Sequence, residues 1–174
     1  VSYIIEDGPS SAILRRRADG GGAVDTVITS THTIAEAAWS GDGSWLAYRV
    51  TMPSRDIYAI RPGIDSVGIP VVASPKFDER APTISPDGKW LAYQSDESGR
   101  DEIYVQPYPA TGARWQISTE GGRTPFWTGR GRQIGFVGLE SLGPIVVEQA
   151  VLDAAVRGTQ PLTVLLGHHH PLDA

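Results

Sequence analysis

The charged side chains best suited to binding chemistry gather in two short polar stretches of the chain. They are Lys76, Asp78, Glu79, Arg80, Glu120 and Arg123. Acidic and basic groups side by side in a loop suit a polar ligand or a loop of a partner protein, although solvated loop charges give the same pattern. A glycosidase would need two carboxylates that converge across a sugar, and no pattern in the sequence places such a pair. The two stretches therefore predict binding without catalysis.

Two other patterns could bind a metal, but each has a simpler interpretation. The Asp-Gly pairs at 42–43 and 87–88 fit β-turns, because Asp bonds to nearby backbone and Gly tolerates positive φ. The histidine run at 168–170 would alternate between the two faces of an extended segment, so its three rings do not converge on one ion. The sequence therefore predicts neither a metal site nor a cofactor.

A basic run, Arg15–Arg17, stands out in an acidic chain. Asp19 and three glycines follow it, which indicates an exposed strand edge or turn. An anionic partner or a lipid headgroup is the functional alternative for such a run of charge.

The composition excludes several classes of protein. The 174 residues carry a formal net charge of −5, whereas a nucleic-acid-binding domain usually has a basic face. The chain contains no cysteine, so disulfides and thiolate metal ligands are excluded. Its apolar runs are too short to cross a bilayer. The length fits one domain, and a start at Val1 within a strand-like pattern suggests a piece of a longer protein.

An internal repeat sets the architecture. Residues 39–48, WSGDGSWLAY, match residues 84–93, ISPDGKWLAY, at seven of ten positions after a shift of 45 residues. A weaker copy, WTGRGRQIGF, follows at 127–136, and the start of the chain, VSY, matches LAY at 91–93. A period of about 40–45 residues with four short strands is typical of a β-propeller blade. Tryptophans recur at repeat positions, which favours packing between blades over ligand stacking.

Alternating apolar residues and Gly/Pro turns divide each repeat into strands, labelled a to d in order. The predicted strands are 1–5, 12–16 and 24–29; 36–40, 45–50, 56–60 and 69–73; 82–85, 90–95, 102–106 and 113–118; and 124–128, 133–137, 144–148 and 162–166. The predicted blades are therefore 1–30, which lacks strand a, then 36–74, 80–119 and 123–166, with a tail at 167–174. Residues 149–156 could form a short helical turn. The predicted fold class is all-β: one propeller segment of about four blades, each a four-stranded antiparallel sheet.

Propeller geometry would bring the two polar stretches together. Both are d–a loops, and the d–a and b–c loops of successive blades meet at one mouth of the central channel. The missing strand a leaves the ring open, so closure requires either further sequence or pairing between copies of the chain.

The repeat carries a family resemblance. ISPDGKWLAY at 84–93, with SDESG at 95–99 and EIYV at 102–105, resembles the WD40-like (PD40) repeat of TolB, of the periplasmic Tol–Pal system, and of prolyl-oligopeptidase-type peptidases. RWQISTEGG at 114–122 and PFW at 125–127 are more similar to the C-terminal propellers of bacterial serine/threonine protein kinases. The resemblance implies the periplasmic or extracytoplasmic side of a bacterial membrane. Neither kinase motifs nor a G-x-S-x-G elbow is present, so the resemblance covers the propeller alone.

We therefore expect a non-catalytic binding or scaffolding propeller, a sensor or protein-interaction module from a larger, kinase-linked bacterial protein. Its partner would be a protein or a small polar ligand at the channel mouth, with neither nucleic acid nor a membrane span involved. A TolB-like periplasmic interaction module is one alternative. A propeller hydrolase or lyase with a site at the channel mouth is another.

Overall fold

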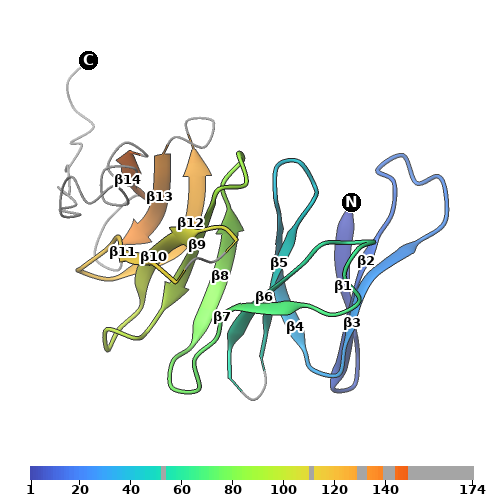
Figure 1. The fold of residues 1–174 in the computed structure, drawn as a ribbon, viewed down its shortest axis with the longest axis horizontal. Helices are drawn as coiled ribbons and strands as arrows, with labels where there is room; N and C mark the ends of the chain where they lie inside the picture. The colour runs from blue at the N-terminus through green and yellow to red at the C-terminus, as the bar shows by residue number, and fades with distance from the viewer. Residues whose placement is uncertain (52–53, 110–111, 129–132, 139–143, 149–174) are drawn as a thin grey trace.

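The computed structural model describes residues 1–51, 54–109, 112–128 and 133–138, and the backbone of 144–148. These residues form four antiparallel sheets and contain no helix. Figure 1 shows the sheets side by side, from the blue N-terminal sheet to the orange sheet at the other end. The prediction of an all-β chain built from about four antiparallel sheets is confirmed.

Each sheet is one blade, and the blades follow one another in chain order. Blade 1 contains β1 (Ser2–Asp7), β2 (Ser10–Arg15) and β3 (Asp25–Ser30). Blade 2 contains β4 (Ile34–Trp39), β5 (Leu46–Val50), β6 (Asp56–Ile60) and β7 (Ile69–Val72). Blade 3 contains β8 (Glu79–Ile84), β9 (Trp90–Ser95), β10 (Glu102–Pro107) and β11 (Trp115–Gln116). Blade 4 contains β12 (Gly122–Thr128), β13 (Gln133–Gly138) and β14 (Pro144–Glu148).

The strand bounds differ from the prediction mainly at strand ends. β6, β9 and β14 match it, whereas β8 and β12 begin earlier because each runs through a bulge into the preceding loop. β11 covers only two residues of the predicted 113–118. The Ser118 hydroxyl accepts the amide hydrogen of Ile103 at 2.8 Å, so a side chain replaces the backbone partner there. The predicted strand at 162–166 and helical turn at 149–156 lie outside the described residues.

The a–b turns explain the repeated Asp-Gly pairs. In blade 3 the Ser85 hydroxyl donates to Asp87 Oδ1 at 2.6 Å and accepts from the Trp90 amide at 3.0 Å. Gly88 closes the turn at φ 72° and donates its amide to the Ser85 carbonyl at 2.8 Å. Residues 40–45 of blade 2 repeat these bonds. The aspartates thus serve the turn, as the sequence indicates.

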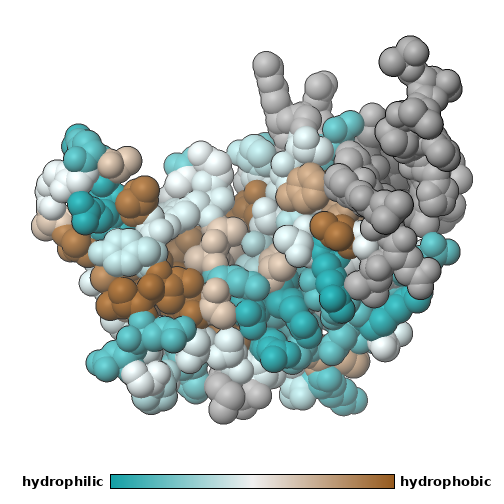
Figure 2. Space-filling view, turned by 180° about the vertical axis from the view of Figure 1, so that it is seen from behind, coloured by the Kyte–Doolittle hydropathy of each residue, from teal (hydrophilic) through white to brown (hydrophobic). Residues whose placement is uncertain are grey.

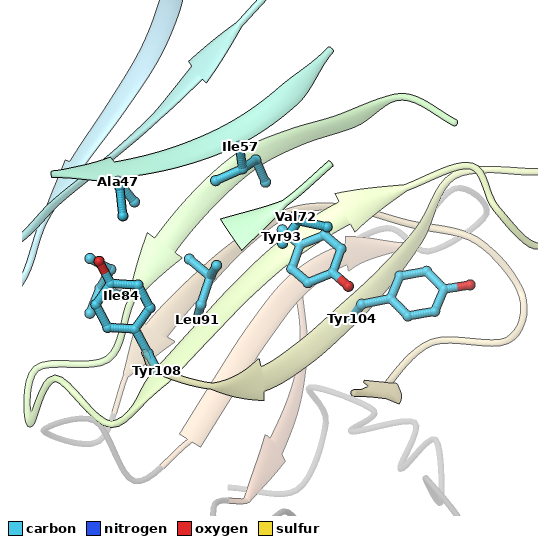
Figure 3. Packing of buried hydrophobic residues seen from close by; sticks show 9 residues of the cluster. Ala47, Ile57, Val72, Ile84, Leu91, Tyr93, Tyr104 and Tyr108 are labelled. Carbon is cyan, nitrogen blue, oxygen red and sulfur yellow. The ribbon is translucent and has the colours of Figure 1, made fainter. Parts of the chain in front are cut away.

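The hydrophobic core lies between blades. In Figure 3, Leu91 and Tyr93 of blade 3 face Ala47 and Ile57 of blade 2, and all four side chains are at most 1% exposed. The same two repeat positions are buried at all three interfaces between blades. They hold Leu46, Leu91 and Ile134, and Tyr48, Tyr93 and Phe136. The five tryptophans belong to these clusters or pack against them, which agrees with the packing role predicted from the repeat.

Replacing Leu91 by Ala tests the packing between blades. Leu91 has no exposed surface, so the substitution leaves a cavity between blades 2 and 3. We expect the free energy of unfolding, measured by urea denaturation, to fall by about 2–5 kcal/mol. The control is Val67→Ala in the β6–β7 connection. Val67 is 70% exposed, so its replacement should cost less than about 0.5 kcal/mol. Equal losses in the two variants would contradict this account of the core.

Candidate functional site

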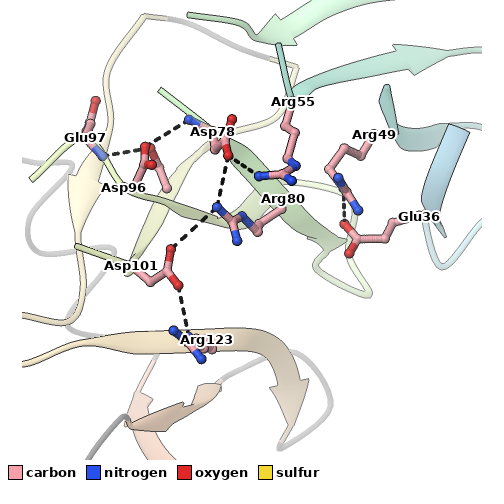
Figure 4. Close-up of polar contacts among 10 residues, drawn as sticks. Glu36, Arg49, Arg55, Asp78, Arg80, Asp96, Glu97, Asp101 and Arg123 are labelled. Carbon is pink, nitrogen blue, oxygen red and sulfur yellow. Dashed lines mark hydrogen bonds and ion pairs between the residues drawn. The ribbon is translucent and has the colours of Figure 1, made fainter. Parts of the chain in front are cut away.

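Five charged side chains of alternating sign form a chain of ion pairs across blades 2 to 4, as Figure 4 shows. In spatial order they are Arg55, Asp78, Arg80, Asp101 and Arg123. Arg55 pairs with Asp78, and Arg80 Nη2 lies 3.2 Å from Asp78 Oδ2 and 3.8 Å from Asp101 Oδ1. Arg123 Nε lies 3.0 Å from Asp101 Oδ2. We call these five residues the charge ladder.

Backbone hydrogen bonds hold the loops that carry the charge ladder. Arg55 and Asp101 end the b–c loops of blades 2 and 3, directly before β6 and β10. The amide of Glu79 donates to the Arg55 carbonyl at 2.6 Å, and that of Gly122 donates to the Asp101 carbonyl at 2.9 Å. Each b–c loop is therefore tied to the first strand of the next blade. The amide of Asp78 adds a bond of 2.9 Å to Asp96 Oδ1.

β8 and β12 each contribute one arginine to the charge ladder, and in both strands a bulge follows that arginine. Ala81 follows Arg80 and Thr124 follows Arg123, and both have φ 51°, a left-handed conformation that costs roughly 1–2 kcal/mol in such residues. The amide of Ala81 donates to Glu36 Oε2 at 2.6 Å, across the interface with blade 2. Bulges re-aim side chains, and these two let the arginines enter the charge ladder while the rest of each strand stays paired.

The charge ladder is shielded at its centre and open at its ends. The Asp101 side chain is 13% exposed, whereas those of Arg55 and Arg123 are 46% and 56% exposed. Exposed pairs of this kind contribute only about 0–1 kcal/mol each to stability. The fold therefore does not depend on the terminal arginines, and their guanidinium groups retain donors that face solvent.

A buried acid lies directly beside the charge ladder. Glu79 is 2% exposed, and its Oε2 has no hydrogen-bond partner among the described residues. Burial raises the pKa of Glu79 to about 8, with help from the nearby carboxylates of Asp56, Glu97 and Asp96. A large share of Glu79 is thus protonated at neutral pH, which avoids a second buried negative charge next to Asp56.

Replacing Glu79 by Gln tests this assignment. A carboxyl whose pKa rises from 4.5 to about 8 on folding favours the protonated native state, so wild-type stability falls as pH rises through this window. The variant lacks the titrating proton and should lose that dependence. We expect it to be about 1–3 kcal/mol more stable than the wild type at pH 9, with a smaller difference at pH 5. Urea denaturation at both pH values measures this, and a difference that does not change with pH would refute the assignment.

The structure brings together three of the six residues predicted for the site. Asp78, Arg80 and Arg123 belong to the charge ladder, and Glu79 is buried beside it, whereas Lys76 and Glu120 are exposed and lie outside it. The sequence reasoning left out Arg55 and Asp101. The sequence does offer one indication of these two residues, because each is the last residue before strand c of its blade.

The other candidates lie elsewhere or outside the described residues. Arg15 pairs with Asp25 across β2 and β3 at 2.7 Å and Arg17 pairs with Asp19 at 2.8 Å. The basic run therefore lies at the end of β2, the central strand of its sheet, and leads into a turn, so the predicted turn is present but the predicted exposed edge is not. Within the described residues no three Asp, Glu or His side chains could hold one metal ion, and no helix there could span a membrane. The histidine run at 168–170 falls outside that part of the chain.

Solved structures share this arrangement of sheets, although no protein-family model and no curated protein matches the sequence. TolB from Acinetobacter baumannii aligns with a TM-score of 0.69 and 21% identity, over 83% of this chain and 37% of that chain. A puromycin-hydrolysing peptidase from Mycobacterium tuberculosis gives a TM-score of 0.65 and 19% identity, over 87% and 28%. An oligogalacturonate lyase in complex with manganese gives 0.61 and 15%, over 81% and 40%.

These similarities define the fold as a TolB-like β-propeller, in which the four sheets are consecutive blades. The predicted resemblance to the PD40 repeat is confirmed at this level. The chain spans 37% of the length of the Acinetobacter TolB chain.

Proposed function

We propose that this chain is a non-catalytic protein-interaction module that binds its partner at the loop end of blades 2 to 4. The observation that carries the proposal is the charge ladder: loops and adjoining strand ends of three blades present its charges, and hydrogen bonds between the blades fix those loops. A surface that is ordered before binding loses little conformational entropy when a partner docks.

The ends of the charge ladder define the chemistry of the partner. Arg55 and Arg123 each pair with one carboxylate inside the ladder and expose about half of the side chain. A guanidinium group carries five N–H donors in a planar fork, so each end can also receive a carboxylate of the partner. The acidic centre at Asp101 is already bound on both sides by Arg80 and Arg123. We expect a partner loop with acidic side chains spaced to reach the two ends.

We also propose that this chain is part of a longer protein, which could be of two kinds. The resemblance at residues 114–127 supports a kinase-linked parent, whereas the similarity of the fold to TolB supports a periplasmic interaction module. A kinase domain in the flanking coding sequence would support the first. A cleavable signal with a separate N-terminal α/β domain would support the second.

A propeller hydrolase or lyase is the second candidate function, because the peptidase and the lyase named above share the fold. Catalysis at the channel mouth would require acidic or basic groups that are free to act on a substrate. Asp78 and Asp101 are instead bound by two arginines each. This pairing favours binding over catalysis.

Affinity capture with matched arginine variants tests the proposed function. The immobilised chain is compared with Arg55→Ala/Arg123→Ala and with Arg17→Ala, whose side chain is 74% exposed on blade 1. We expect the double variant to retain its partner roughly tenfold less well, since loss of an interfacial arginine costs about 1–2 kcal/mol. The Arg17 variant should behave like the wild type. A partner that all three proteins retain equally, in quantitative mass spectrometry, would contradict binding at the charge ladder.

A further inference from the structure

Two buried carboxyl groups lie beside the first ion pair of the charge ladder. Most charged side chains that the structure describes are at least partly open to solvent, and Figure 2 shows hydrophilic surface in the lower middle of its view. Asp56 and Glu79 are instead 8% and 2% exposed. Neither is ion-paired among the described residues, whereas the third buried acid there, Glu102, pairs with Arg100 at 2.8 Å. A buried carboxyl group without a cation is costly to ionise and therefore retains its proton more strongly.

The two carboxyl groups compete for few hydrogen-bond donors. The Ser74 amide donates to Asp56 Oδ1 at 3.3 Å and also faces Glu79. Asp56 Oδ2 accepts from the Ser54 hydroxyl at 2.7 Å, whereas Glu79 Oε2 has no partner among the described residues. Glu79 has fewer donors than Asp56, so Glu79 is the residue that holds the proton.

The other titratable groups that face Glu79 supply no free positive charge. Asp96 and Glu97 approach from the b–c loop of blade 3, and Tyr93 approaches from β9. The Glu97 carboxylate pairs with Arg114 at 2.6 Å, so this cation is already engaged. Burial and the surrounding negative charges together raise the pKa of Glu79 to about 8.

The backbone segments that carry this carboxyl pair also carry the first ion pair of the charge ladder. Arg55 directly precedes Asp56, and Asp78 directly precedes Glu79. The Glu79 amide donates to the Arg55 carbonyl at 2.6 Å, which ties the two segments together. On β8 itself, the next cation, Arg80, pairs with Asp78 and not with Glu79. Arg55 and Asp78 attract each other, as Figure 4 shows, whereas Asp56 and an ionised Glu79 repel each other.

We propose that the proton on Glu79 is a switch that keeps the charge ladder assembled for docking. The proposal rests on the function proposed above and adds its regulation by pH. While Glu79 is protonated, the two segments stay joined, and Arg55 is held where a carboxylate of the partner can reach it. Loss of the proton leaves two buried negative charges side by side, which loosens the backbone that places Arg55 against Asp78. The module therefore releases an acidic partner in alkaline conditions.

NMR of the chain alone tests the coupling without a partner. The Glu79 carboxyl carbon should titrate with a midpoint of about 8, and the Cζ resonance of Arg55 should move with the same midpoint. In Glu79→Gln, which mimics the protonated acid and cannot ionise, Arg55 should show no such step. The matched control is Glu6→Gln, which replaces an exposed glutamate of β1 and should behave like the wild type. An Arg55 step that persists in Glu79→Gln, or a Glu79 titration that leaves Arg55 unmoved, would overturn the proposal.

Docking is measured separately, with a short polyglutamate peptide as the probe. If only the protonated module binds, a midpoint of about 8 predicts that the competent fraction falls from about 0.9 at pH 7 to about 0.1 at pH 9. The dissociation constant of the wild type should therefore rise about tenfold, and that of Glu79→Gln should stay constant. Equal dissociation constants at the two pH values in the wild type would overturn the switch and leave the proposed function standing. Absence of binding at pH 7 would contradict the proposed function and, with it, the release of a partner.

Discussion

A blade of this propeller is apolar on both faces, and it becomes stable only when neighbouring blades cover it. In β9 the side chains of Trp90 and Tyr93 point to opposite sides, yet they are 7% and 1% exposed. A single sheet would leave one of these faces in water, at a cost of about 25 cal/mol for each Å² of apolar surface. Stacking the blades removes this cost and fixes their order.

The stacking of blades also determines where charged side chains can meet. Because each blade repeats the orientation of the one before it, b–c loops lie beside the d–a loops that begin the next blade. Charges placed in those loops then meet across blade boundaries, as Arg55 meets Asp78 and Arg123 meets Asp101. The charge ladder is therefore a consequence of hydrophobic stacking, although it adds little to stability itself. The face that must be buried and the surface that is free to bind are set by the same repeat.

The carboxyl of Glu79 lies where the buried packing between blades meets the charged loops. Its backbone joins blade 3 to the Arg55 loop, while its side chain points into the protein near Asp56. Protonation of Glu79 removes the charge that burial would otherwise penalise. A position that looks in sequence like part of an exposed charged loop is thus a buried link between blades, and its raised pKa favours the uncharged form.

The sequence predicted the structure correctly at positions where a residue type has one main structural role. The repeated Leu-x-Tyr and Asp-Gly patterns predicted the buried strands and the turns, since alternation and turn chemistry are local properties. Pairing between Arg55 and Asp78 is not local, because it depends on how the blades twist relative to one another. The bulges at Ala81 and Thr124 could not be predicted either, because neither residue type favours positive φ. Burial of Glu79 was missed because Asp78 and Arg80 flank it and indicate an exposed loop.

The central claim is that a partner docks on the charge ladder rather than on the outer blades. Hydrogen–deuterium exchange of the chain, with and without the partner retained in affinity capture, tests this claim most directly. The account predicts slower amide exchange on binding in residues 76–81, 100–102 and 120–124, with no change in β2. Protection confined to blade 1, or no protection in those three segments, would contradict it.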